Sequence, residues 1–419
     1  MPLVNMKDML EHAYRHNYAV GAFEVVNLEF LQGVLAAAER CRGPVILSLP
    51  ESGSRADHEV LLPALEAAAQ RASVPVAIHL EHARDIATVV HAINHGCNGV
   101  KADLGDQELG ENISQTSAMA AAAHDCAVAV EGQLGFVPRP EGPGEISQTT
   151  VAEAKALVER TGVDCLSVIV GSAHSPADGK RKIDWNRLKQ INEELGLPLV
   201  FHIGTSLSDN QIHRLISTGV AKITDHTLGD DIGARLKLRA NAADGGYAAV
   251  MHGVGEAVCE VVEGRMRSWG AAGRAAEVLE RCEHWLPLDQ VINYHADGLD
   301  EQQLATAMDR GLEVLGALPG VRAVYSIKAE DHDGDLRCSW LVRFCHPKAW
   351  ESVRQHPDYV AFADLRVRAA NGGGKPPGDL GAERTQTLAG RARYPHWRGS
   401  EARGADRRSG SGWTRYPGA

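Results

Sequence analysis

The chain has 419 residues, 44% of them hydrophobic and 23% charged, which predicts a globular protein of two or three domains that buries a substantial core. Its formal net charge of -11 argues against a nucleic-acid partner, because neutralising phosphates requires a basic surface. The sequence contains no apolar run approaching the roughly 20 residues of a membrane span, so we expect no membrane partner.

The N-terminus and the cysteines both favour a cytoplasmic protein. The first 20 residues carry scattered charges and lack an apolar core, which is not the pattern of a signal peptide. The eight cysteines are dispersed without a CxxC pair, so we expect buried free thiols and no disulfide framework.

From about residue 5 to 235, short apolar runs alternate with longer amphipathic stretches. Eight β-like runs, each followed by a helical pattern, predict an α/β fold, a (β/α)8 TIM barrel, although doubly wound sheets also alternate in this way. A final amphipathic helix, roughly Val250 to Trp285, is expected to close this domain. The runs are YAVGAF, PVILSL, VPVAIHLEH, GVKAD, CAVAVEG, CLSVIVGS, PLVFHIG and AKIT.

A different pattern begins near Leu288 and predicts a ferredoxin-like α+β domain over residues 286–370. A strand VINYHA is followed by a helix with Asp300 as its N-cap, by strands VRAVYSIKA and CSWLVRFC, and by a helix that starts at Pro347. The segments LPGVRAVYSI and HPDYVAFA resemble the stress-responsive A/B barrel family, whose members form α+β barrels by dimerisation. The resemblance implies a homodimer or a higher homo-oligomer.

Residues 371–419 form a third segment, which is rich in Gly, Pro and Ser. It carries nine Lys/Arg against four Asp/Glu, whereas the whole chain is acidic. This composition predicts a disordered basic tail.

Three histidines follow the third, sixth and seventh β-like runs: His82, His174 and His202. The carboxyl ends of barrel strands meet at one mouth, and three imidazoles are a common ligand set for catalytic zinc. Acidic groups accompany them. Glu81 stands beside the first histidine as a general acid or base, and Asp103 and Glu131 at the fourth and fifth strands are candidates for a second metal.

These segments resemble the class II, zinc-dependent fructose- and tagatose-bisphosphate aldolases over residues 3–275. The resemblance is carried by LVNMKDMLEHAYRHNYAVGAFEVVNLE, PVILSLPES, VAIHLEHA, RTGVDCLSVIVGSAH, LPLVFHIGTS and RMRSWGAAGRA. It implies one zinc per chain on the three histidines, where the ion acts as a Lewis acid on a ketone donor and stabilises its enediolate. It further implies that Glu141, in LGFVPRPEGPGE, removes the α-proton, and that Glu81 protonates the aldehyde oxygen, in place of the family's aspartate.

The chain departs from the family pattern around the substrate phosphate. Ser175 replaces a glycine, the HGGSG loop reads HIGTS with Ile203, Gly204 and Thr205, and Thr224-Asp225-His226-Thr227 replaces the usual NVAT. Near the start, AFNV reads AFEV with Glu24, and Gln133 replaces a second-metal carboxylate. The residues expected to contact substrate or phosphate are Ser175, Gly204, Thr205, Thr224 and Thr227.

Glycine-rich loops bind phosphate because their N–H groups are unobstructed, so these changes predict an altered substrate. The leading interpretation is a zinc-dependent aldolase that acts on small ketone and aldehyde substrates of the phosphorylated-sugar type. Two alternatives stay open: an isomerase, epimerase or other lyase using the same zinc site, and an inactive homologue that acts in assembly.

Overall fold

The computed structural model describes residues 2–49, 55–136, 147–171, 183–203, 207–240, 247–295, 300–330, 336–370, 386–387 and 414–415. The chain divides into two compact units, Met1–Trp285 and Leu286–Ala419.

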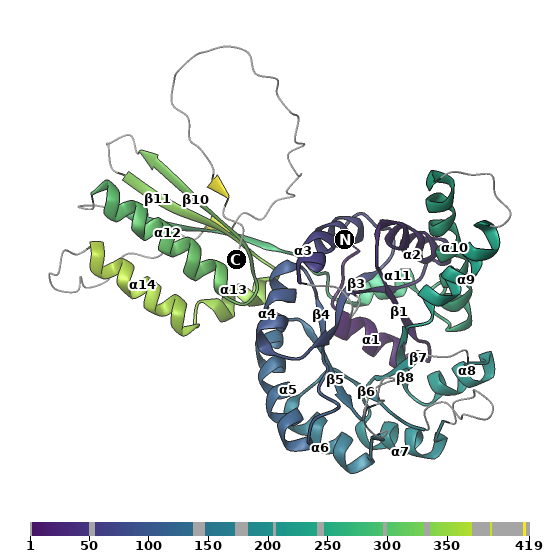
Figure 1. Cartoon of the computed structure of the whole chain (residues 1–419). Helices are drawn as coiled ribbons and strands as arrows, with labels where there is room; N and C mark the ends of the chain where they lie inside the picture. The colour runs from purple at the N-terminus through teal and green to yellow at the C-terminus, as the bar shows by residue number, and fades with distance from the viewer. Residues whose placement is uncertain are drawn as a thin grey trace. The chain divides into compact units, whose positions relative to one another are not determined.

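The first unit is a closed barrel of eight parallel strands, so the predicted (β/α)8 barrel is confirmed (Figure 1). The sheet closes where β1 pairs with β8. The strands are buried on both faces, which is why the sequence shows them as continuous apolar runs rather than alternating ones. They are β1 (Val20–Glu24), β2 (Val45–Leu49), β3 (Val76–Ala83), β4 (Gly99–Ala102), β5 (Ala129–Leu134), β6 (Cys165–Val168), β7 (Leu199–Ile203) and β8 (Val220–Asp225).

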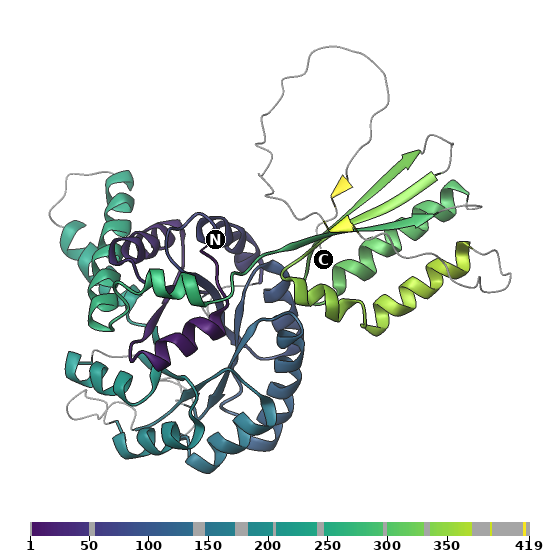
Figure 2. The ribbon, with the colours of Figure 1, turned by 180° about the vertical axis from the view of Figure 1, so that it is seen from behind.

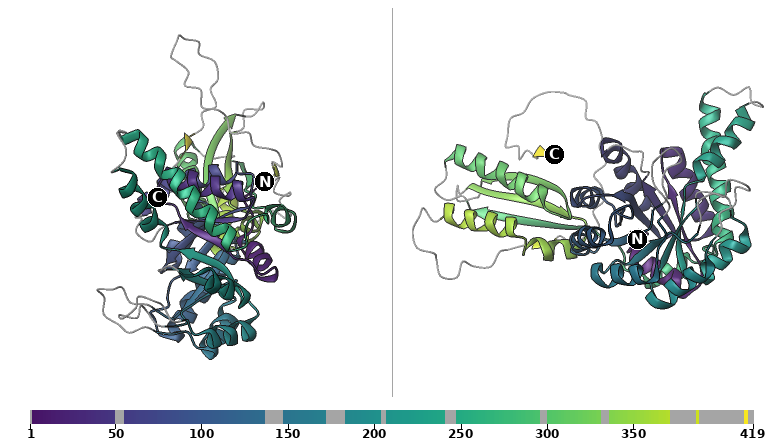
Figure 3. Two further views of the ribbon diagram at one scale, coloured as in Figure 1. Left: turned by 90° about the vertical axis from the view of Figure 1, so that its right-hand side faces the viewer. Right: turned by 60° about the horizontal axis from the view of Figure 1, so that its bottom comes forward.

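Helices surround the barrel on its outside (Figure 3). Several begin at side-chain caps, such as Asp85, which accepts a hydrogen bond from Thr88 N at 2.7 Å. The helices are α1 (Met6–Arg15), α2 (Leu28–Cys41), α3 (Arg55–Ala69), α4 (Ile86–His95), α5 (Leu109–His124), α6 (Val151–Thr161), α7 (Trp185–Leu195), α8 (Asp209–Ser217), α9 (Leu228–Ala240), α10 (Tyr247–Ser268) and α11 (Ala275–Arg281).

The predicted single closing helix from Val250 to Trp285 is wrong, because α10 and α11 are separate helices. The chain turns between them at Gly270 and Gly273, whose φ angles of 74° and 84° lie in the left-handed region that glycine adopts without strain.

Helix α1 lies across one end of the barrel, as the view from behind shows (Figure 2). Its buried face includes Met6, Met9 and Leu10, and the preceding residue Leu3 bridges to Val76 at the start of β3. This helix therefore covers the amino ends of the strands, and the carboxyl ends form the opposite mouth.

The second unit is an antiparallel sheet with helices, in the predicted β-α-β-β-α order. Trp340 is its largest fully buried side chain and packs against Gly311 of α12, whose N-cap is Asp300 as expected. The elements are β9 (Leu288–His295), α12 (Glu301–Ala317), β10 (Val321–Glu330), β11 (Leu336–Phe344), α13 (Pro347–Val353), α14 (Pro357–Ala370), β12 (Gln386–Thr387) and β13 (Thr414–Arg415).

The sheet order is β12-β9-β11-β10-β13. Two short pieces of the predicted tail thus pair with the sheet, and the rest of residues 371–419 lies outside the described residues. None of the helices in the described part of the chain combines the length and apolar character that a membrane span requires.

Candidate active site

The barrel interior contains two glutamates and a lysine that form one buried charged cluster. Lys222 Nζ on β8 lies 2.9 Å from Glu81 Oε1 on β3 and 2.6 Å from Glu131 Oε2 on β5, and all three side chains are fully buried. Buried charges persist only when they are paired and hydrogen-bonded, and the ammonium group between the carboxylates provides both.

Other donors complete the surroundings of Glu81. Its Oε1 accepts hydrogen bonds from Ser48 Oγ at 3.1 Å and Thr224 Oγ1 at 3.3 Å, and His79 Nδ1 lies 3.1 Å away. Its Oε2 accepts no hydrogen bond from any described residue, although Lys101 Nζ lies 3.9 Å away. One oxygen of Glu81 is therefore saturated, and the other is a buried acceptor with its capacity unused.

The charges fix the ionisation of this cluster. Burial alone would raise the pKa values of Glu81 and Glu131, but the Lys222 ammonium holds both well below their usual range. Burial opposes the charge of Lys222 in turn, yet the two carboxylates raise its pKa above the ordinary value. At neutral pH both carboxylates are therefore ionised.

His202, at the end of β7, connects this cluster to the mouth. Its Nε2 lies 3.3 Å from Glu131 Oε1 and 3.5 Å from Lys101 Nζ. Burial and the charge of Lys101 lower the pKa of His202 to about 3, so the imidazole is neutral at physiological pH. A neutral imidazole is the form that binds a metal ion.

His82, at the end of β3, likewise has a carboxylate at one ring nitrogen. Its Nδ1 lies 2.7 Å from Asp103 Oδ2, at the residue that follows β4. Burial opposes the ionisation of Asp103, but the hydrogen bond with His82 and the charge of Lys101 lower its pKa. The register between β3 and β4 shifts between Leu80 and Ala83, a strand irregularity of the kind that redirects side chains beside active sites.

The donor atoms of Glu81, Glu131 and His202 lie within 4.8 Å of one another, so this group could hold a metal ion. Lys222 already lies between the two carboxylates, however, and together with Lys101 it balances their charge. A divalent ion between the carboxylates would be repelled by both ammonium groups.

The imidazoles of His82 and His202 are better candidates for metal ligands than the two carboxylates. Zinc-binding histidines usually have one ring nitrogen engaged by a carboxylate, which fixes the ring and increases its basicity. His82 with Asp103 and His202 with Glu131 both show this arrangement. His82 and His202 are therefore each arranged as a zinc-binding histidine commonly is.

Asp225, at the end of β8, faces the protein and not the mouth. It is 1% exposed, forms an ion pair with Arg265 of α10, and accepts hydrogen bonds from Thr227 N and Oγ1, each at 2.9 Å. Arg265 also donates to Thr227 Oγ1 at 2.7 Å. The Thr227 hydroxyl is thus engaged within the protein, as is the fully buried Thr224 hydroxyl through Glu81.

His226 follows β8 at the mouth and lies between Glu24 and His202. Its Nδ1 is 3.2 Å from Glu24 Oε1, and its Nε2 is 2.9 Å from His202 Nδ1. Burial opposes protonation of His226, but the hydrogen bond with Glu24 and nearby negative charge outweigh it and raise the pKa of His226.

The structure brings together Glu81, Glu131 and His202, and separately His82 and Asp103. Gln133, at the expected second-metal position, donates from Nε2 to Gly135 O at 3.3 Å. The remaining expected site residues lie outside the described residues: Glu141, His174, Ser175, Gly204 and Thr205.

Sequence reasoning missed both lysines and His79. A lysine within a buried strand, as in GVKAD and AKIT, was a usable signal, because lysine is almost never fully buried without a charged partner. The interior glutamates Glu81 and Glu131 supply that partner.

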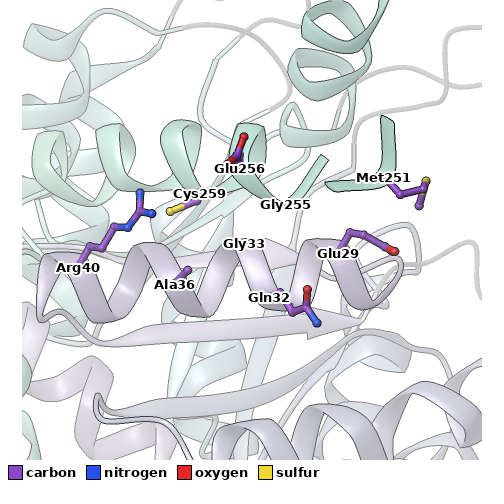
Figure 4. Close-up of a pocket in the computed structure, with 9 residues that line it drawn as sticks. All are labelled: Glu29, Gln32, Gly33, Ala36, Arg40, Met251, Gly255, Glu256 and Cys259. Atoms are coloured by element: carbon purple, nitrogen blue, oxygen red, sulfur yellow. The ribbon is translucent and has the colours of Figure 1, made fainter. Parts of the chain in front are cut away.

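A separate surface groove of about 410 Å³ lies between α2 and α10, away from the barrel interior (Figure 4). The two helices cross closely at Gly33, where a Cβ would lie 2.6 Å from Gly255 O. The groove is lined by Glu29, Gln32, Gly33, Ala36, Arg40, Met251, Gly255, Glu256 and Cys259.

Comparison with known proteins agrees with the barrel fold. Residues 4–274 match the family model described as fructose-bisphosphate aldolase class-II. The chain is 35% identical to a probable fructose-bisphosphate aldolase of Bacillus subtilis (strain 168) over 285 residues, and 35% identical to the fructose-bisphosphate aldolase of Geobacillus stearothermophilus over 288 residues. Each match covers 66% of this chain and 100% of the relative.

Two solved structures are similar. The YdjI aldolase from Escherichia coli K12 superposes with a TM-score of 0.58 at 29% identity, covering 65% of this chain and 99% of the other. A putative fructose-1,6-biphosphate aldolase from Coccidioides immitis superposes with a TM-score of 0.59 at 25% identity, covering 65% of this chain and 98% of the other.

The barrel fold and these matches together define a carbon–carbon lyase of the TIM-barrel type. The chain belongs to the class II fructose-bisphosphate aldolase family, which is zinc-dependent.

Proposed function

We propose that the chain is a zinc-dependent aldolase that binds one zinc ion through His82, His174 and His202 and acts on a ketose phosphate. The observation that carries the proposal is the pairing of two of these histidines with carboxylates, His82 with Asp103 and His202 with Glu131. Both pairs stand at the carboxyl ends of strands in a barrel of this family, and His174 is added from the resemblance.

When bound, zinc would polarise the ketone carbonyl and make the adjacent C–H more acidic. Glu81 transfers the proton to and from the oxygen of the aldehyde product. Because Lys222 keeps it ionised, Glu81 accepts the hydroxyl proton during cleavage and returns it during synthesis. Its Oε2 is the oxygen with acceptor capacity to do so. Glu141 is proposed as the base for the α-proton.

The substrate phosphate is proposed to bind near Ser175, Gly204 and Thr205. Thr224 and Thr227 are proposed to contribute to this subsite through its scaffold, since their hydroxyls are engaged by Glu81 and by Asp225 with Arg265. Ile203 is 7% exposed immediately before this segment, and a β-branched side chain at a position where the family has glycine would restrict the approach of a phosphate. We therefore propose a ketose phosphate other than the one the relatives are named for.

The test is cleavage of ketose 1-phosphates and 1,6-bisphosphates, with aldehyde and ketone products quantified separately. We expect cleavage that a chelator abolishes and zinc restores. Interconversion of ketoses without cleavage would replace the aldolase proposal with an isomerase or epimerase. No turnover of any ketose by fully zinc-loaded protein would support an inactive homologue.

For the second unit we propose a stress-responsive A/B barrel-like domain that dimerises. The support is its antiparallel sheet with helices α12 and α14 packed against each other. The protein ending at Trp285 should have a lower oligomeric order than the full chain by light scattering, and an equal order would contradict the proposal.

We also propose a cytoplasmic location. In the described part of the chain seven cysteines are free and buried, which is typical of a reducing compartment.

A further inference from the structure

The two oxygens of Glu81 face two different lysines inside the barrel. Lys222 Nζ lies 2.9 Å from Oε1, which also accepts hydrogen bonds from Ser48 and Thr224. Lys101 Nζ lies 3.9 Å from Oε2, which accepts no hydrogen bond from any described residue. The first contact is a hydrogen-bonded ion pair, whereas the second is too long for a direct hydrogen bond.

Lys101 also differs from Lys222 in how its N–H donors are used. Lys222 Nζ has both carboxylates within hydrogen-bond distance, Glu81 at 2.9 Å and Glu131 at 2.6 Å. Lys101 projects from β4 and is only 3% exposed, yet its recorded partners in the described part of the chain are His202 Nε2 at 3.5 Å and Glu81 Oε2 at 3.9 Å. A hydrogen bond to the imidazole would use only one of the three N–H groups of Lys101, so donors remain for a bound molecule.

The separation between Lys101 Nζ and Glu81 Oε2 matches the size of one oxygen atom. An oxygen at about 2.8 Å from both atoms spans 3.9 Å with an angle of about 90° at that oxygen. It would accept a hydrogen bond from the ammonium group and donate one to the carboxylate. A hydroxyl group has the lone pairs and the hydrogen that this position requires.

We propose that Lys101 is a further catalytic residue, which binds the hydroxyl oxygen of the substrate while Glu81 Oε2 takes the proton. In cleavage the O–H electron pair forms the carbonyl of the aldehyde, and the electron pair of the breaking C–C bond stays with the ketone half. In synthesis the same steps run in reverse. Lys101 keeps its protons throughout and stabilises the negative charge that develops on the oxygen.

The inference rests on the proposed aldolase function and gives the two lysines different roles. Lys222 balances the charge of the buried carboxylates, and Lys101 acts on the reacting oxygen. Only the steps that involve this oxygen require Lys101. Exchange of the α-proton of the ketone alone involves no aldehyde, so it should proceed without Lys101. A purely structural role would affect both reactions.

The test compares these two reactions in the full-length, zinc-loaded protein. Cleavage of ketose 1-phosphates and 1,6-bisphosphates is followed by aldehyde release, and exchange of dihydroxyacetone phosphate in deuterated water is followed by NMR. Lys101→Met removes the charge and the donors, and Lys101→Gln restores a donor without the charge. Lys155→Met, at an exposed lysine that pairs with Glu194, is the control. Zinc content and urea unfolding are measured for every variant.

We expect Lys101→Met to lower kcat for cleavage about 10²- to 10³-fold, with a much smaller change in KM. Proton exchange and zinc content should stay at the wild-type level. Lys101→Gln should recover part of the cleavage rate, because its amide can still donate a hydrogen bond. Glu81 stays paired with Lys222 in both variants, which should preserve the folded protein.

Wild-type cleavage by Lys101→Met would overturn the inference. A parallel loss of cleavage, proton exchange and zinc in both Lys101 variants would also overturn it, because it would show a structural role. Neither result affects the proposed function as long as the wild type cleaves a ketose phosphate. A zinc-loaded wild-type protein that cleaves none would overturn the proposed function, and this inference with it.

Discussion

Lys222 Nζ lies 2.6 Å from Glu131 Oε2, and both side chains are fully buried inside the barrel. The same ammonium group binds Glu81, so a single cation neutralises carboxylates from β3 and β5. The site is therefore built on a charge balance in the core.

Replacing this cation should destabilise the protein severely. Lys222→Met leaves two buried carboxylates without their shared partner, and we expect a loss of about 3–5 kcal/mol in the free energy of unfolding. Urea unfolding of the zinc-free protein measures it. Lys155→Met, which removes an exposed pair with Glu194, is the control and should change little. A Lys222→Met protein as stable as the control would contradict the charge-balance account.

Glu81→Gln should lower kcat about 10²- to 10⁴-fold, because the amide cannot accept or return a proton. Zinc content should stay at the wild-type level, since Glu81 is not among the proposed ligands. Ser48→Ala removes only one of the hydrogen bonds to Glu81 Oε1 and should have a much smaller effect. Unchanged kcat in Glu81→Gln, measured by product formation at saturating substrate, would refute its role in proton transfer.

Asp164, beneath the barrel, should make stability depend on acid pH. Burial opposes its ionisation, but hydrogen bonds from His124 Nε2 and Val130 N lower its pKa. Its contribution is complete above the unfolded value of about 3.9 and disappears as the pH falls through the lower folded value.

Asp164→Asn should therefore cost about 1–3 kcal/mol at pH 7 and flatten the acid limb of the stability curve. Unfolding midpoints between pH 7 and pH 3 test this, with the exposed Glu11→Gln as control. Parallel acid limbs for wild type and Asp164→Asn would be evidence against it.

In the second unit, Gly311→Ala should be destabilising. A Cβ there would lie 2.6 Å from the Nε1 atom of the buried Trp340, and overpacking of this kind costs about 1–3 kcal/mol. Gly316→Ala on the same helix meets nothing within 4 Å and should be neutral or stabilising by up to about 1 kcal/mol. Calorimetry of the full-length variants compares their unfolding temperatures. Equal unfolding temperatures would show that Trp340 can move aside, which would contradict the prediction.

The barrel could be predicted from the sequence because its strands are short, mainly apolar runs with helical patterns between them. The closing segment could not, because the periodicity of α10 continues into α11 and only the left-handed Gly270 and Gly273 separate them. Hydrophobic periodicity in the sequence does not predict a turn of this kind.

At the site, residue type and strand position were enough to select His82, His202 and Glu81. Their partners were hidden because they come from other strands: the contact between Lys222 and Glu131 joins residues 91 apart in the chain. The same reason applies to Asp225, because its ion-pair partner Arg265 comes from α10 and lies 40 residues further along the chain.

The most direct test of the proposed chemistry is exchange of the α-proton of dihydroxyacetone phosphate in deuterated water, followed by NMR, with zinc-loaded protein. We predict zinc-dependent loss of one carbon-bound proton, abolished in His202→Ala. Failure of the fully loaded wild-type protein to exchange a proton from this or any other phosphorylated ketone would contradict the account.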